Sequence, residues 1–254
     1  MSSTLHRIVQ LAHNDARLVA RDNMLILFCV FLVAMGIGMR YALPALDTAL
    51  AQRGVMPSDD VALRFSDTYP AFVVFVGVWQ GANIPGVLVG FLLLGEKEDR
   101  TLAALRVTPL PFSLYTGYRV GFAAVVTFAS IVYLVLVMDQ CPLPWWPLLP
   151  IAVGGSLTAP LAALFYATFA ADKVQGLAFT KFAGVAGLSI LLGYFAPEPW
   201  QWLLSVFPPF LIAKAYWMAL EGRALYWMPL VMGSLLQLGL LVALVPRFRR
   251  VAAR

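Results

Sequence analysis

The chain is most highly charged in the stretch Gly95-Glu96-Lys97-Glu98-Asp99-Arg100-Thr101-Leu102-Ala103-Ala104-Leu105-Arg106-Val107-Thr108-Pro109. Six charged side chains fall within the eleven residues from Glu96 to Arg106, and long apolar segments flank them on both sides. Even one charge in the hydrocarbon of a bilayer costs several kcal/mol. The stretch must therefore lie outside the membrane, as a compact element between two membrane spans.

The composition around this stretch is that of an integral membrane protein. The 254 residues are 61% hydrophobic and 12% charged, with a mean hydropathy of +0.81. Soluble domains are typically about 45–50% apolar and about 25% charged. The length fits one transmembrane domain over residues 1–254. The net charge of +5 lies mostly at predicted membrane edges, which favours membrane orientation and anionic lipid over nucleic acid.

Six apolar segments are long enough to span a bilayer, since a spanning helix needs about 20 mostly apolar residues. We predict an all-α polytopic membrane protein with spans at about 23–43, 69–94, 112–138, 146–170, 176–196 and 226–246. Residues 1–22 place apolar side chains at spacings of three and four, which predicts an N-terminal amphipathic helix along the membrane interface. A leader helix without a role is the alternative.

The segment 197–224 is apolar and aromatic, but Pro208-Pro209 divides it. Each half is too short to cross, so we predict re-entrant or interfacial helices before the last span. A seventh crossing is the alternative, and it would place the two termini on opposite sides.

The distribution of Lys and Arg favours six spans. Thirteen fall on the side of both termini: Arg7, Arg17, Arg21, Lys97, Arg100, Arg106, Arg119, Lys173, Lys181, Arg247, Arg249, Arg250 and Arg254. Five fall on the other side: Arg40, Arg53, Arg64, Lys214 and Arg223. Because basic residues are retained in the cytoplasm, both termini are predicted to be cytoplasmic.

The sequence lacks the common catalytic motifs. It has no phosphate-binding loop, no His-Glu-x-x-His and no Gly-x-Ser-x-Gly, and its two histidines, His6 and His13, lie in the leader. We therefore expect no catalytic residue, no metal site and no cofactor bound by this chain.

The charged stretch has its own helical pattern. The acidic residues Glu96, Glu98 and Asp99 come first, and Arg100 and Arg106 follow them. Two leucines, Leu102 and Leu105, stand three residues apart. This order of charges complements a helix macrodipole. The pattern predicts a short helix over 95–109 that docks into a groove on a soluble partner, and a solvated loop is the alternative.

The second span contains Gln80, Asn83 and Pro85 at mid-depth. Amides in hydrocarbon are unfavourable unless they are paired or face a cavity. Gln80 and Asn83 are therefore candidates for the substrate path, with Pro85 permitting a bend. Pairing with neighbouring helices explains them equally well, and both interpretations stay open.

The residues from Gly95 to Leu102 and from Val107 to Leu110 resemble the signature of type-2 ATP-binding-cassette exporter permeases. In that family a Glu-rich stretch, a Gly-Thr pair, leucines and a Pro-Leu follow the second span. The resemblance extends to the six spans, the leader and the re-entrant region, and it is closest to small drug-export permeases, including fluoroquinolone exporters. The chain departs from the pattern at Arg100, where the family usually has Gly before Thr101.

This resemblance implies a separate ATPase subunit, which binds ATP and magnesium and grips the 95–109 coupling helix and the turn after the fourth span. The residues implied in docking are Glu96, Glu98, Arg100, Thr101, Leu102, Leu105, Asp172 and Lys173. It also implies a dimer with a second copy or a related permease, and outward export of an amphipathic small molecule or drug across the inner membrane. The alternatives are a secondary transporter or channel and a membrane scaffold protein, neither with an ATPase partner.

Overall fold

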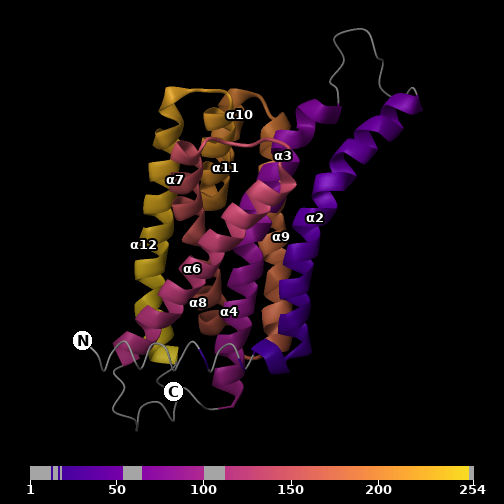
Figure 1. Ribbon diagram of the computed structural model, residues 1–254. Coiled ribbons are helices and arrows are strands. Elements are labelled where there is room, and N and C mark those ends of the chain that lie inside the picture. The colour runs from indigo at the N-terminus through magenta and orange to yellow at the C-terminus, as the bar shows by residue number, and fades with distance from the viewer. Residues whose placement is uncertain (1–12, 14–16, 18, 54–64, 100–111, 252–254) are drawn as a thin grey trace.

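The computed structural model describes residues 13, 17, 19–53, 65–99 and 112–251, and these residues form helices and connections without a strand. In this part of the chain six helical segments are long and apolar enough to cross a membrane, and they lie side by side in a bundle (Figure 1). They are Leu25–Gln52, Phe65–Glu98, Ser113–Met138, Trp145–Phe169, Lys173–Phe195 and Ala224–Val251. The predicted all-α membrane protein with six spans is thereby confirmed.

Each span is made of one or more helical elements. In chain order the helices are α2 (Asn23–Gln52), η1 (Phe65–Thr68), α3 (Tyr69–Val73), the π-helical η2 (Val74–Gln80), α4 (Gly81–Glu98), α6 (Phe112–Met138), α7 (Trp145–Ser156), α8 (Thr158–Phe169), α9 (Lys173–Phe195), α10 (Glu198–Gln201), η4 (Trp202–Val206), α11 (Pro208–Leu220), η5 (Ala224–Tyr226) and α12 (Trp227–Val251). The fourth span is therefore two helices that meet at Leu157.

We call the end of the bundle where α2 begins, α4 ends and α12 ends the termini end, and the opposite end the far end (Figure 1). The second span forms the centre of the bundle, since 78% of its apolar window is buried, against 11% for the first span. The first span turns most of its apolar side chains outward, as a lipid-facing helix does.

Close helix packing in the centre depends on glycines of the second span. A Cβ added at Gly90 would lie 2.6 Å from the Tyr166 ring on α8, and one added at Gly77 would lie 2.9 Å from Val135 on α6. Small residues of this kind allow backbones to approach closely in membranes.

Two helices run past the predicted ends of their spans. The helix of the second span does not stop at 94, because α4 continues to Glu98, where the Asp99 N–H still donates to the Gly95 carbonyl at 2.9 Å. Glu96 and Glu98 consequently lie in the last turn of α4 and not in a separate helix. The first span runs on to Gln52, past Pro44. The rest of the predicted 95–109 helix, from residue 100 on, and most of the predicted 1–22 leader (1–12, 14–16 and 18) lie outside the described residues.

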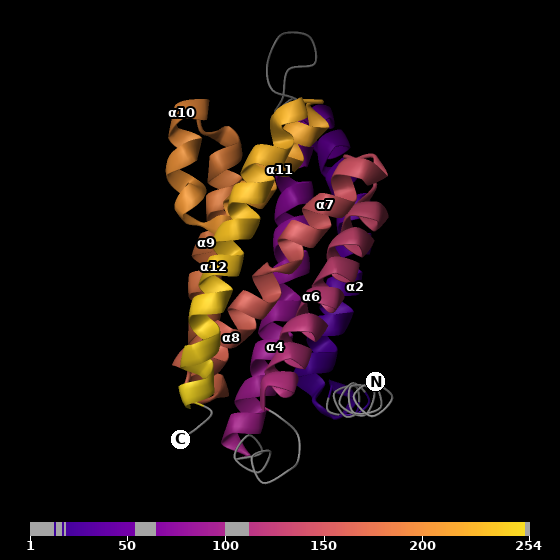
Figure 2. The same cartoon turned by 90° about the vertical axis from the view of Figure 1, so that its left-hand side faces the viewer.

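The segment between the fifth and sixth spans folds back on itself. The start of α11 packs between two spans, with Phe210 against Gly193 of α9 and the Pro208 carbonyl against Gly233 of α12. From there α11 returns to the far end, where the Tyr216 hydroxyl donates to the backbone carbonyl of Cys141 at 2.7 Å. Figure 2 shows α10 at the end of the bundle opposite the last residues of α12. A seventh crossing is thus excluded, while entry of this hairpin into the bilayer stays a prediction.

The packing of α9 on the second span can be tested with two glycines one turn apart. A Cβ at Gly187 would overlap the buried Trp79 indole, whereas a Cβ at Gly184 would meet nothing within 4 Å. We expect Gly187→Ala to destabilise the protein by about 1–3 kcal/mol, as overpacking does. Gly184→Ala should leave stability unchanged or raise it slightly. Thermal unfolding in detergent measures both, and equal midpoints would contradict this packing.

Candidate functional site

The last turn of α4 is bonded to the connection between α8 and α9. The backbone N–H of Lys173 donates to the Glu98 carboxylate at 2.8 Å, and the Lys97 ammonium donates to the Ala170 carbonyl at 2.8 Å. These bonds join two segments more than 70 positions apart in the sequence. At the termini end, therefore, the second span is attached to the connection between the fourth and fifth spans.

Local capping explains why this connection is tight. Asp172 has an extended backbone and its carboxylate accepts from the Gln175 N–H at 2.8 Å, which caps α9. The Lys173 ammonium lies 3.5 Å from the Asp22 carboxylate just before α2. This ion pair is partly exposed and contributes at most about 1 kcal/mol. Lys173 nevertheless connects three parts of the chain: the approach to α2, the end of α4 and the start of α9.

The structure brings three of the predicted docking residues together. Glu98, Asp172 and Lys173 form one partly exposed group at the termini end, which we call the junction. Glu96 belongs to the same turn of α4, but its carboxylate faces the bundle interior. The remaining predicted docking residues lie outside the described part of the chain: Arg100, Thr101, Leu102 and Leu105. Docking itself stays a prediction.

Glu96 pairs with α6. Its carboxylate accepts hydrogen bonds from the Arg119 guanidinium and from the Tyr115 hydroxyl. Arg119 Nε also donates to the Tyr115 hydroxyl at 3.1 Å, and the guanidinium carbon lies 5.3 Å and 5.7 Å from the ring centroids of Tyr115 and Tyr118. Only 2% of the Arg119 side chain is exposed. An arginine remains charged in proteins, so it requires such partners when buried.

Sequence reasoning missed the role of Arg119 and Tyr115. The charge distribution assigns Arg119 to the loops of the termini side, whereas it lies two turns inside α6, within a candidate span. A signal for it exists in the sequence, because an arginine inside an apolar helix needs an acidic partner at similar depth. Glu96, Glu98 and Asp99 are acids at that end, but the predicted end of the second span at 94 separates all three from the bundle.

Gln80 and Asn83 bond to each other within their own helix. The Asn83 amide donates to the Gln80 carbonyl oxygen at 3.3 Å, and both side chains are half-buried. Gln80 ends the π-helical segment, and Pro85 is buried within α4 just after it. π-helical turns occur frequently at functional sites. Neither amide lines the wide apolar groove of about 500 Å³ between α7 and α12, so their place on a substrate path stays a prediction.

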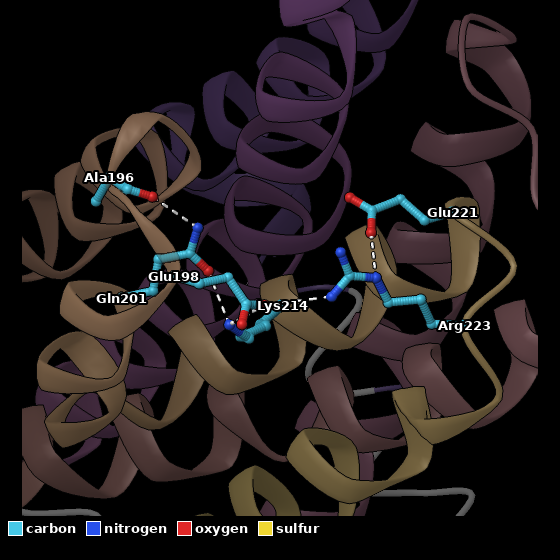
Figure 3. A network of polar contacts seen from close by, with 6 residues as sticks. All are labelled: Ala196, Glu198, Gln201, Lys214, Glu221 and Arg223. Atoms are coloured by element: carbon cyan, nitrogen blue, oxygen red, sulfur yellow. Dashed lines mark hydrogen bonds and ion pairs between the residues drawn. The ribbon is translucent and has the colours of Figure 1, made fainter.

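A second polar network holds the hairpin at the far end (Figure 3). The buried Lys214 ammonium donates to Gln201 Oε1 at 2.8 Å, lies 3.4 Å from Glu198 and stands 4.5 Å from the centroid of the Trp202 ring. Glu198 also pairs with Arg223 at 3.3 Å. The sequence indicates Lys214 only as a basic residue of the far side. These contacts fix α11 to α10 and η4, since a buried ammonium is stable only with partners.

Reactivity of Cys141 reports on how closely the hairpin covers the far end. Burial raises the pKa of the Cys141 thiol to about 11, from an ordinary value of about 9. The thiolate is the reactive form, so at pH 8 its fraction is about 100-fold lower than in an unburied thiol. We expect alkylation by iodoacetamide in a Cys29→Ser variant to be slow at pH 8 and to accelerate steadily up to pH 10. The same protein unfolded in SDS is the control, and equal rates before and after unfolding would contradict the burial.

Within the described residues, no three His, Cys, Asp or Glu side chains are grouped so as to hold a metal ion. The ion pairs of the described residues lie toward the two ends of the bundle. Pairs of this kind hold helices in position and can transmit movement between them.

Comparison with known proteins identifies the family. Residues 15–245 match the family model described as "Fluoroquinolones export permease protein Rv2686c-like". Two curated relatives, the fluoroquinolones export permease proteins MT2760 and Rv2686c of Mycobacterium tuberculosis strains CDC 1551 / Oshkosh and ATCC 25618 / H37Rv, are each 31% identical over 243 residues. The alignment covers 93% of this chain and 91% of each relative. No solved structure matches the chain. The chain therefore belongs to the Rv2686c-like family of fluoroquinolones export permease proteins.

Proposed function

We propose that this chain is the transmembrane subunit of an ATP-driven exporter, which moves a small amphipathic drug outward across the inner membrane. A separate ATPase subunit supplies the energy by docking at the termini end. The family supports the export of a drug, and the names of the relatives favour fluoroquinolones as the first substrates to test. The observation that carries the ATPase proposal is the junction, where the central span ends in bonded charged residues beside the 100–111 segment.

The proposed orientation follows from charge. In the six-span topology, thirteen of the eighteen Lys and Arg residues of the sequence are assigned to the termini side and five to the far side. Basic residues are retained on the cytoplasmic side, so both termini and the junction are cytoplasmic in this proposal. An ATPase fed by cytoplasmic ATP can then reach the 95–109 segment.

Movement applied at the junction would reach most of the bundle. Glu98 belongs to the most buried span and is bonded to the start of α9, so displacement of the 95–109 segment would shift the second and fifth spans together. The energy comes from the ATPase, because ATP-dependent differences in its affinity for two permease conformations shift their populations. Six spans form half of the pathway in this class of exporter, and a second copy or a related permease supplies the other half.

Docking is tested by adding charge to the two leucines of the 95–109 segment. We expect a Leu102→Asp/Leu105→Asp variant, co-expressed with its ATPase, to retain at least tenfold less ATPase on purification from detergent, because a buried unpaired carboxylate opposes binding at an apolar contact. Export of a fluoroquinolone from cells should fall with it.

The matched control is Leu225→Asp, at a 57% exposed apolar position of η5 at the far end, which should leave the amount of bound ATPase unchanged. Equal ATPase recovery with the unmodified and the double-aspartate chains would contradict docking at 95–109. Absence of any ATPase with the unmodified chain would favour a secondary transporter or a scaffold protein.

A further inference from the structure

Glu96 and Glu98 are neighbours on α4 but face different surroundings. The side chain of Glu98 is exposed and accepts from the Lys173 amide, whereas only 13% of the Glu96 side chain is exposed. Glu96 is held by Arg119 and Tyr115, both on α6. An ATPase could contact Glu98 without rearrangement of the permease. It could reach Glu96 only by taking it away from a buried guanidinium.

Glu96 and Arg119 lie on the two helices that the 100–111 segment connects. α4 ends at Glu98 and α6 begins at Phe112, so the two helices flank the 100–111 segment in the sequence. Glu96 and Arg119 join these helices within two turns of that segment. A displacement of the segment therefore acts on two helices that are joined by an ion pair, so α4 and α6 would move together.

The chemistry of the pair makes the cross-link resistant to separation. The guanidinium is buried, keeps its charge, bonds to the Tyr115 hydroxyl and lies near two aromatic rings. Separating it from Glu96 would remove a carboxylate partner from a buried charge, which is strongly unfavourable. Arginine is suited to this position because its planar group bonds and stacks at the same time.

We propose that Glu96, Arg119 and Tyr115 form a clamp that transmits movement of the 95–111 segment from the second span to the third. Glu96 and Arg119 are then positioning residues of transport, and Glu96 is not a contact of the ATPase. This inference rests on the proposed function and replaces the docking role expected of Glu96.

The test separates docking from transmission. Glu96→Gln and Arg119→Gln variants are co-purified with the ATPase, reconstituted in lipid vesicles and measured for bound ATPase, ATP hydrolysis and fluoroquinolone transport. We expect bound ATPase within about twofold of the unmodified complex, and drug transported per ATP hydrolysed to fall about tenfold, a typical size for coupling between two sites. The exchanged pair Glu96→Arg/Arg119→Glu should recover a large part of the transport, because it restores the attraction.

The control is the Arg40–Asp139 ion pair, which lies exposed at the far end with a separation of 3.3 Å. Arg40→Gln should change neither bound ATPase nor the transport ratio. If Arg119→Gln does not yield folded protein, Arg119→Lys keeps the charge while removing the planar fork, and it should lower the transport ratio without releasing the ATPase.

Three results would overturn the inference. Loss of the ATPase with Glu96→Gln alone would make Glu96 a docking contact. An unchanged transport ratio in Glu96→Gln, or in Arg119→Lys where that variant is needed, would remove the clamp from the transport cycle. Failure of the unmodified chain to retain an ATPase would refute the proposed function, and the clamp with it, whereas a lower ratio with the ATPase still bound concerns the clamp alone.

Discussion

A bilayer accepts a charged side chain only at its edge or beside a partner, and the last turn of α4 meets this constraint in both ways. Glu98 turns toward the surface and bonds to the start of α9, while Glu96 turns inward and neutralises Arg119. These two carboxylates connect the most buried span to its neighbours on opposite sides. The arrangement of the bundle at the termini end depends on this turn.

Further from this end, the structure concentrates features that permit bending near the centre. The second span contains a π-helical segment and Pro85, and the fourth span is divided at Leu157 between α7 and α8. Beside that division the buried Thr158 hydroxyl donates to Gln237 Oε1 on α12 at 2.9 Å. Helices interrupted in this way change direction with little disruption of their hydrogen bonds. The last turn of α4 is held by bonds to its neighbours, and the helices near the centre can bend. Both features are compatible with the proposed exporter, in which force at the termini end changes the side of the membrane to which the substrate path opens.

The six spans and the folded-back hairpin could be predicted from sequence, because length and hydrophobicity in a bilayer leave few alternatives. The end of the second span could not, since the charges after Gly95 were read as the start of a new element. Glu96, Lys97 and Glu98 are in fact carried by the same helix as it leaves the apolar region, and each has a bonded partner there. Because the second span was predicted to end at 94, Glu96 could not be recognised as the partner of Arg119. Lys214 escaped notice because its burial depends on the fold of the hairpin and not on its neighbours in sequence.

An ATPase that uses cytoplasmic ATP can dock beside the junction only if the junction faces the cytoplasm. This is measured directly by labelling single cysteines with a membrane-impermeant maleimide, in a Cys29→Ser/Cys141→Ser background in intact cells. Cysteine placed at Asp99, exposed just after α4, is predicted to label only after the membrane is permeabilised, whereas cysteine placed at Gln52, exposed at the far end of α2, is predicted to label without it. Labelling of the Asp99→Cys protein in intact cells would place the junction outside the cell and contradict the account.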